Sequence, residues 1–193
     1  KGKLLVFDEE TQKVSKVLQS LQTSTLSDGH LKVHQAEAYR LSHLLSADRQ
    51  VVFSKNFEQL VHDLRYPEEY ALPDISVQAT LRDYQQLGVR WLSMLADYGF
   101  GGILADDMGL GKTLQTIAFL SSRLTKQSRV LILAPSSLIF NWQDEFKKFA
   151  PQLDVAVSYG LKPARDSIIA ENHQVIISSY AAFRQDFETY QSQ

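Results

Sequence analysis

The stretch GGILADDMGLGKTLQT (residues 101–116) decides the fold, because it nearly matches a loop that binds phosphate groups. The general pattern of such loops is G-x-x-x-x-G-K-[ST], and Gly111, Lys112 and Thr113 supply its last three positions. The first position should be glycine, but it is Asp106. The stretch is therefore a damaged nucleotide site, a chance match, or a phosphate loop of a different kind.

The context of the loop suits a phosphate site. GGILA (101–105) is strand-like and is expected to lead into the loop, and the apolar spacing of KTLQTIAFLSSRLT (112–125) predicts a helix. The first turn of such a helix directs free N–H groups toward a bound phosphate. Lys112 would then reach the β- and γ-phosphates, and the Thr113 hydroxyl would bind Mg²⁺.

The glycines of the loop separate the alternatives. Gly109 and Gly111 let the backbone curl closely around an anion, since neither carries a Cβ. The alternative is a purely structural role, in which the glycine-rich turn joins a strand to a helix and binds no ligand. A dinucleotide loop is excluded, because the last glycine of G-x-G-x-x-G would fall at Leu114 and Lys112 would have no use.

Outward from the loop, strand-like and helical stretches alternate from residue 81 to the end of the chain. The expected strands after GGILA are RVLILA (129–134), DVAVSY (154–159) and QVIISS (174–179). The expected helices are 81–99, 112–125, 137–149, 164–172 and the last residues. Continuous apolar strands suit a parallel sheet that is buried on both faces, and the repeated units predict an α/β fold.

Two of these helices have an apolar stripe that predicts which face is buried. The first stripe is Tyr84, Leu87, Trp91 and Leu95, in a helix that Gly99 ends. The second stripe is Trp142, Phe146 and Phe149. We expect both stripes to face the core.

The first 65 residues show helical patterning and little chemistry. Apolar residues at helical spacing occur in 11–22 (Val14, Val17 or Leu18, Leu21) and in 34–46 (Ala38, Leu41, Leu45), and 50–64 predicts a short strand followed by a helix. Residues 66–80 contain two prolines and no period, which is typical of a linker. The sequence therefore divides into a mainly helical region (1–65), a linker (66–80) and an α/β lobe (81–193).

Composition excludes several classes of protein. His30 and His34 stand at helical i, i+4 spacing, but without a third ligand they are better interpreted as surface histidines than as a metal site. The absence of cysteine excludes disulfides and thiolate metal sites.

No apolar run approaches the length of a membrane span, and the N-terminus does not resemble a signal peptide, so a cytoplasmic protein without a membrane partner is the default. A net charge of −2 means that nucleic-acid binding would have to rest on local residues.

The residues DDMGLGKTLQT (106–116) resemble the first nucleotide motif of the Swi/Snf-type helicase-related ATPases, in which the position of Asp106 is characteristically acidic. This resemblance answers the opening question, since the loop is intact and belongs to another kind. It implies ATP and Mg²⁺ as ligands. The nucleotide-binding residues that it implies are Asp107, Met108, Gly109, Leu110, Gly111, Lys112 and Thr113, with Lys112 and Thr113 catalytic and Thr113 the Mg²⁺ ligand.

LRDYQQLGVRWL (81–92) resembles the motif that precedes this loop in the family, where a glutamine reads adenine. That role falls on Gln85, whose amide can pair with two atoms of the adenine edge. Arg82 and Tyr84 are candidates for stacking or packing beside the nucleotide. A surface helix docked on the core would explain Leu87 and Trp91, but it gives no reason for Gln85.

Two later stretches resemble the motifs that follow the DNA backbone in this family. In LILAPSSLIFNWQDEFKKF (131–149) the implied DNA contacts are Ser137 and Asn141, with Ser136 and Ser137 at a helix start. In VIISSYAAFRQDF (175–187) they are Ser179 and Tyr180, where the family usually has Thr-Thr-Tyr. Serine also caps helices, so structural roles for these serines remain open. Trp142 is interpreted as core.

The resemblance covers about residues 81–193 and implies the first RecA-like lobe of an ATPase that translocates on double-stranded DNA. Residues 1–65 resemble more faintly the helical segment before the ATPase in the bacterial branch of the family. No D-E-x-H-like carboxylate pair follows a strand, and no second lobe with an arginine finger is present, so the chain is expected to be a fragment that does not hydrolyse ATP alone. A nucleotide-gated protein-interaction module is the main alternative, and a P-loop kinase is a weaker one.

Overall fold

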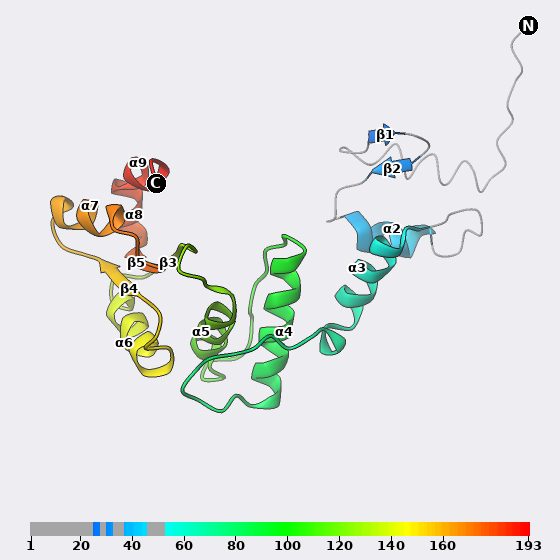
Figure 1. The fold of residues 1–193 in the computed structure, drawn as a ribbon, viewed down its shortest axis with the longest axis horizontal. Coiled ribbons are helices and arrows are strands. Elements are labelled where there is room, and N and C mark those ends of the chain that lie inside the picture. The colour runs from blue at the N-terminus through cyan, green and yellow to red at the C-terminus, as the bar shows by residue number, and fades with distance from the viewer. Residues whose placement is uncertain (1–24, 28–29, 33–36, 46–52) are drawn as a thin grey trace, which may run out of the picture. The chain divides into compact units, whose positions relative to one another are not determined.

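The computed structural model describes residues 25–27, 30–32, 37–45 and 53–193 (Figure 1). The chain forms two compact units. Unit 1 comprises Lys1–Tyr70 and Met94–Gly102, and unit 2 comprises Ala71–Ser93 and Ile103–Gln193. The residues expected to form a linker are divided between them, 66–70 in unit 1 and 71–80 in unit 2. Among the described residues, no helix has both the length and the apolarity needed to cross a membrane.

The described part of unit 1 contains a small antiparallel strand pair and helices. Its elements are β1 (Thr25–Ser27), β2 (His30–Lys32), α2 (Ala38–Leu45), α3 (Lys55–Arg65) and the 3-10 helix η2 (Pro67–Glu69). Helix α3 starts after Ser54, whose hydroxyl accepts a hydrogen bond from the Phe57 N–H at 3.3 Å. The helices expected within 34–46 and 50–64 are confirmed, and Leu41 of the first is buried. The helix expected at 11–22 lies outside the described residues.

Two sequence patterns of unit 1 lie partly outside the described residues. His30 lies in strand β2, so it does not share a helical face with His34, which is outside the described residues. Residues 53 and 54 form no strand before α3, and 50–52 are not described. A three-residue strand is too short to show a period of two, which explains why the pattern of the sequence missed the β1–β2 pair.

The carboxylate of Asp63, in α3, is buried and holds two parts of unit 1 together. The Tyr98 hydroxyl donates a hydrogen bond to its Oδ2 at 2.6 Å, and the Gln59 amide donates to its Oδ1 at 2.7 Å. Burial of the hydroxyl, followed by its hydrogen bond to Asp63, raises the pKa of Tyr98 well above its usual value.

Replacing Tyr98 with phenylalanine is expected to lower the free energy of unfolding by about 1–3 kcal/mol at pH 7, because Asp63 stays buried and loses a charged hydrogen bond. A phenol whose pKa is raised by folding stabilises fully below its unfolded pKa of about 10, and this stabilisation is lost as the pH rises toward the folded pKa. Urea unfolding should therefore show that the free energies of unfolding of wild type and Tyr98→Phe differ less at pH 10.5 than at pH 7. The half-exposed Tyr66 provides the control Tyr66→Phe, and an equal loss in both variants would contradict the assignment.

Unit 2 is built on a three-stranded parallel sheet with the order β3-β5-β4. Its strands are β3 (Val130–Ala134), β4 (Val155–Ser158) and β5 (Val175–Ser179). In the central strand β5, Ser178 lies opposite Ser158 of β4, and Ser179 lies opposite Ala134 of β3. The expected α/β class with a parallel sheet is confirmed, as are three of the four expected strands.

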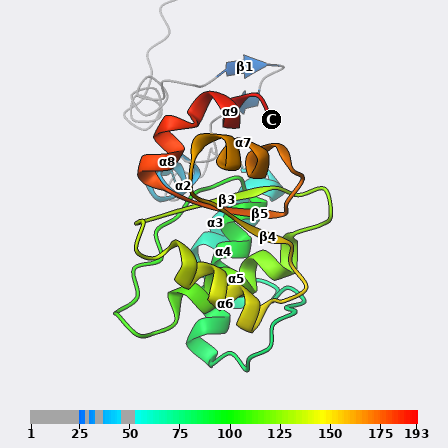
Figure 2. The ribbon, with the colours of Figure 1, turned by 90° about the vertical axis from the view of Figure 1, so that its left-hand side faces the viewer.

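Helices cover both faces of this sheet. They are α5 (Lys112–Arg123), α6 (Ile139–Phe149), α7 (Lys162–Ala170), α8 (Tyr180–Gln185) and α9 (Phe187–Gln191). Figure 2 shows α5 and α6 on one side of the sheet and α7, α8 and α9 on the other. The core on the α5 and α6 side contains the buried residues Ile117, Leu120, Ala134, Ile139, Phe146, Ala150, Val175 and Ile177. Trp142 and Phe149 pack against it, so the stripe expected for 137–149 is confirmed.

Within unit 2, residues 71–80 pack against the start of α4 (Asp83–Asp97) and against α5. Leu72, Ile75 and Val77 lie against the buried residues Leu81 and Val89 and their neighbours. Two hydrogen bonds hold the same segment in place: the Gln78 N–H donates to the Phe149 carbonyl at 2.7 Å, and the Gln152 amide donates to the Ser76 carbonyl at 2.6 Å.

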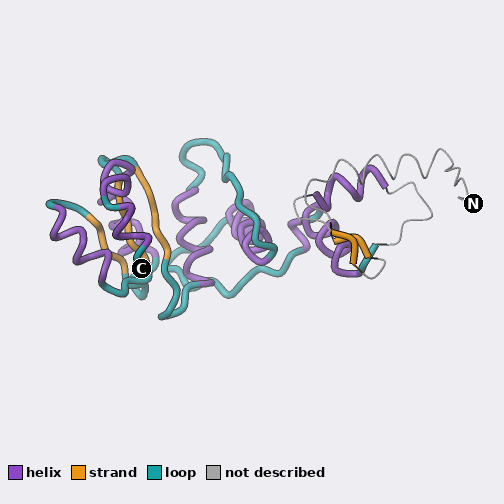
Figure 3. The backbone as a smooth tube through the Cα atoms, turned by 90° about the horizontal axis from the view of Figure 1, so that it is seen from above, coloured by secondary structure: helices purple, strands orange, loops and turns teal. Residues whose placement is uncertain are grey.

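The strand expected at GGILA is not formed. Residues 100–107 have no regular secondary structure, and Figure 3 draws the whole connection between the two flanking helices as loop. Ile103 is 85% exposed. A strand exists only through hydrogen bonds to a neighbouring strand, and the described residues offer this segment none. Two glycines in five residues give it little strand preference of its own.

The buried face of α4 (Asp83–Asp97) also differs from the expected stripe. Gln85, Val89 and Ser93 are buried at i, i+4 and i+8, whereas Tyr84 and Leu87 are exposed. Trp91 is half-buried, and of the expected stripe only Leu95 is buried. Which face of α4 is buried depends partly on polar side chains, such as Gln85, that form hydrogen bonds within unit 2. A count of apolar residues cannot detect these bonds. Gly99, with φ +68°, follows the end of the helix as expected.

Candidate functional site

The loop of residues 106–113, hereafter the 106–113 loop, joins an exposed segment to the first turn of α5. Gly109 and Gly111 have φ angles of +84° and +74°, in the left-handed region that favours glycine. Gly111 is also the N-terminal cap of α5, so the helix begins at Lys112, as expected. This backbone presents the free N–H groups of a helix start at a curled loop, which is a geometry suited to binding an anion.

Lys112 is turned toward the carbonyls of its own loop. Its Nζ donates to the carbonyl oxygen of Asp106 at 2.7 Å and to that of Asp107 at 2.9 Å. Asp107 and Met108 are exposed, Met108 by 96%. Thr113 follows in the first turn of α5 and is partly buried. The structure thus brings the implied loop residues together around the start of one helix.

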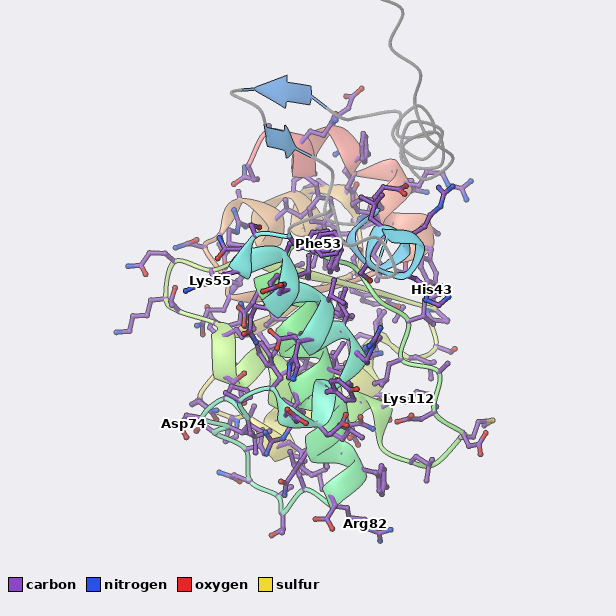
Figure 4. The ribbon with its side chains drawn as sticks, turned by 90° about the vertical axis from the view of Figure 1, so that its right-hand side faces the viewer. His43, Phe53, Lys55, Asp74, Arg82 and Lys112 are labelled. Atoms are coloured by element: carbon purple, nitrogen blue, oxygen red, sulfur yellow. The ribbon has the colours of Figure 1, made fainter. Side chains whose placement is uncertain are left out.

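Gln85 lies directly beneath the loop and is only 7% exposed. Its Oε1 accepts a hydrogen bond from the Arg82 N–H at 3.0 Å, and its Nε2 donates to the Leu110 carbonyl at 3.2 Å. A Cβ at Gly111 would lie 2.6 Å from the same nitrogen, so any other residue there would force the Gln85 side chain to shift. Gln85 therefore supports the loop in this structure. Arg82 lies just before α4 with its side chain exposed and extending away from the ribbon, whereas Lys112 begins α5 (Figure 4).

Gln115 is a residue of the site that the sequence analysis did not single out. It is fully buried in α5, and its Nε2 donates to the Asp106 carboxylate at 2.9 Å. The same nitrogen lies 3.4 Å from the Leu110 carbonyl oxygen. The only signal in the sequence was the acid at position 106, which stands where the general pattern has glycine.

The residues expected along the DNA path lie where strands β3 and β5 end. Ser137 and Asn141 are exposed, in the turn after β3 and in the first turns of α6. The turn is closed by a hydrogen bond of 2.8 Å from the Leu138 N–H to the Pro135 carbonyl, and no serine side chain caps α6. Because β3 and β5 are parallel neighbours, their carboxyl ends share one edge of the sheet.

After β5, the two expected contact residues differ in exposure. Ser179 is 8% exposed, and its hydroxyl accepts a hydrogen bond from the Ala182 N–H at 3.1 Å, which caps α8. The structural role that the sequence left open for this serine is therefore present. Tyr180 is 57% exposed at the start of α8 and is accessible to a ligand.

A buried ion pair joins helix α7 to the residue between helices α8 and α9. Arg165 of α7 donates from Nε and Nη2 to the two carboxylate oxygens of Asp186, at 2.6 and 2.9 Å. Its Nη1 donates to the Gly160 carbonyl at 2.6 Å, and Nη2 also reaches Gln185 Oε1 at 3.2 Å. The hydrogen bonds to Asp186 raise the pKa of Arg165. No sequence pattern indicated this pair, because its two residues are 21 positions apart.

Comparison with known proteins identifies the family of this chain. Residues 84–193 match the model of the SNF2-related domain family, and residues 1–73 match the bacterial SNF2 helicase associated family. The second match confirms the fainter resemblance of the N-terminal region. The solved SWI2/SNF2 ATPase core of Sulfolobus solfataricus in complex with dsDNA is 38% identical, with a TM-score of 0.56 over 62% of this chain and 25% of that chain.

Two relatives are similar over much of the chain. YwqA of Bacillus subtilis (strain 168), provisionally named an ATP-dependent helicase/translocase, is 42% identical over 153 residues. The ATP-dependent helicase fft3 of Schizosaccharomyces pombe is 38% identical over 142 residues. These matches cover 74% and 68% of this chain but only 16% and 15% of the relatives. Because the SNF2-related match takes in more than half of the residues, the chain belongs to the SNF2-related domain family, and its α/β unit has the RecA-like fold of the SNF2 ATPase core.

Proposed function

We propose that this chain is the ATP-binding part of a DNA-dependent ATPase that moves along double-stranded DNA. Membership of the SNF2-related family supports the use of ATP, and the dsDNA complex of the Sulfolobus core supports duplex DNA as the partner. The observation that carries the proposal is the 106–113 loop, in which two left-handed glycines and a lysine meet the start of α5.

In the proposed nucleotide complex, the phosphates of ATP occupy the curl of the 106–113 loop. The Lys112 ammonium leaves the carbonyls of Asp106 and Asp107 and pairs with the β- and γ-phosphates, which are stronger partners because they are charged. The Thr113 hydroxyl, one residue further along α5, holds Mg²⁺. The residues from Asp107 to Leu110, of which 107–109 are exposed, close around the phosphates through their backbone N–H groups.

Gln85 is proposed to select adenine. Both ends of its amide are engaged in the structure, by the Arg82 N–H and the Leu110 carbonyl. Each end of the amide keeps a second hydrogen-bonding position, one N–H and one lone pair, so Gln85 can pair with adenine while it still bonds to Leu110. This shared contact would link recognition of the base to the position of Leu110 in the loop. The exposed Arg82 and Tyr84 side chains are available to pack beside the base.

Ser137, Asn141 and Tyr180 are proposed to contact the DNA backbone at the carboxyl edge of the sheet, where all three are exposed. Contacts of this kind position a protein on the duplex without reading its sequence. Ser179 contributes mainly by capping α8, since its hydroxyl already accepts a hydrogen bond there. The capping bond uses a lone pair of this oxygen, so the O–H proton can still be donated to a DNA phosphate.

We also propose that the 193 residues bind nucleotide without turning it over. Phosphoryl transfer depends on a carboxylate that positions the attacking water and on cations that stabilise the transferring group. The two Asp-Glu pairs of the sequence are Asp8–Glu9 and Asp144–Glu145. The second pair lies on helix α6, where Asp144 is exposed and paired with Lys147, so it is not placed for this role.

The test is the rate of ATP hydrolysis by the full-length protein with and without duplex DNA. Duplex DNA is expected to raise the rate, and Asn141→Ala is expected to raise the DNA concentration needed for half-maximal stimulation about 3- to 10-fold by removing one backbone contact. Asn172→Ala is the matched control, because Asn172 is exposed before the amino end of β5, at the opposite edge of the sheet. Nucleotide binding without any DNA stimulation would instead favour a nucleotide-gated protein-interaction module.

A further inference from the structure

A buried glutamine connects the 106–113 loop to the neighbouring helix α4. The Gln115 side chain is 0% exposed and lies against Gly88, so close that a Cβ at Gly88 would overlap its Oε1 atom. No other residue type fits at Gly88 while Gln115 keeps this conformation. The amide is therefore held from one side by the backbone of α4.

The orientation of this amide follows from its two neighbours. Oε1 faces the Cα of Gly88 and has no hydrogen-bond partner, although it is buried. Nε2 faces the Asp106 carboxylate and donates to it. A flipped amide would place its oxygen against a carboxylate oxygen, and two acceptors repel each other. The negative charge of Asp106 thus stabilises the observed orientation at the expense of one unpaired oxygen.

One nitrogen atom of Gln115 reaches both ends of the exposed part of the loop. Asp106, at 2.9 Å, comes before this part, and the Leu110 carbonyl, at 3.4 Å, ends it. Residues 107–109 between these points are exposed. The Asp106 carbonyl in turn accepts the bond from Lys112 Nζ. Asp106 therefore links the buried amide through its side chain to the phosphate-binding lysine through its backbone.

We propose that Asp106 and Gln115 are positioning residues that pre-form the 106–113 loop for its nucleotide. The inference rests on the proposed function of the loop as an ATP site. Gln115, seated on Gly88, fixes where the exposed segment begins and ends, so that less conformational freedom is lost when a nucleotide binds. This role also gives a physical reason for an acid at position 106. A glycine there has no carboxylate for Gln115, and the amide would lose its charged partner.

The test compares Asp106→Ala with Asp106→Asn in the 193-residue chain. The asparagine oxygen can still accept a hydrogen bond from Gln115, whereas alanine cannot. Two quantities are measured at a temperature where every variant is folded: the Kd for Mg·ADP, by calorimetry, and the hydrogen-exchange rates of the amides of residues 107–111. Asp144→Ala, at an exposed aspartate of α6, is the matched control.

Asp106→Ala and Gln115→Ala are expected to weaken Mg·ADP binding about tenfold and to speed exchange in the loop, with exchange in β5 unchanged. Asp106→Asn should recover most of the affinity and of the protection. Equal exchange rates in Asp106→Ala and wild type would overturn the proposed role of Asp106, and so would equal affinities. A wild-type chain that binds no nucleotide, while Asp106→Ala still speeds exchange, would count against the proposed ATP site and leave the loop contact standing.

Discussion

Lys112→Ala is expected to weaken Mg·ADP binding by the 193-residue chain about 30- to 150-fold. The lysine ammonium is a positive charge at the curl of the 106–113 loop, since its Nζ already bonds to two carbonyls of that loop. A charged hydrogen bond to phosphate contributes about 2–3 kcal/mol, which corresponds to this loss of affinity. The fold should survive the change, because Lys112 lies on the first turn of α5 and not in the core.

The matched control for this prediction is Lys126→Ala. Lys126 is exposed in the turn after α5, and its removal changes the net charge equally without touching the loop. Calorimetry of the three proteins separates a local contact from a general effect of charge. Equal affinities of wild type and Lys112→Ala would remove the 106–113 loop as the phosphate site.

Asp186→Ala is expected to lower the free energy of unfolding by about 3–5 kcal/mol. The carboxylate of Asp186 is fully buried and accepts two hydrogen bonds from the Arg165 guanidinium. Removing one partner of a buried ion pair leaves an uncompensated charge, which costs far more than the pair itself stabilises. The loss should appear in urea unfolding at neutral pH as a lower midpoint with a similar slope.

A double variant decides whether the unpaired charge causes this loss. Asp186→Ala combined with Arg165→Leu removes both charges, so it should recover a large part of the stability that Asp186→Ala loses. If the double variant is as unstable as the sum of the two single variants, the charges are independent and the explanation is wrong. The exposed pair of Asp144 and Lys147 on α6 provides a control, and Asp144→Ala should leave the unfolding energy close to that of wild type.

Local patterns predicted most of the α/β unit, because helices and buried strands impose their period on neighbouring residues. Trp142, Phe146 and Phe149 follow the period of one helix, and all three pack into the core as expected. Val175–Ser179 is buried at every position, as its continuous apolar run predicted. Lys112 begins a helix after two glycines, which is the local geometry expected from the loop motif.

The failures occur where a neighbour in space decides the outcome. GGILA was expected to be a strand from its short apolar run, but no described strand pairs with it. Leu87 was expected to face the core and is exposed, because α4 turns Gln85 inward to bond with the loop. The β1–β2 pair was not predicted, because a strand of three residues shows no recognisable period.

For this protein, the sequence by itself determined the order of the helices and of the three sheet strands in the α/β unit, the position of the 106–113 loop and the need for glycine at its turns. These features depend on contacts between residues a few positions apart. Only the tertiary structure decided which polar groups meet: Gln85 with Leu110, Asp106 with Gln115, and Arg165 with Asp186. The physical reason is that each buried polar atom requires a partner of complementary charge at about 3 Å, and folding alone determines which distant residue arrives at that distance.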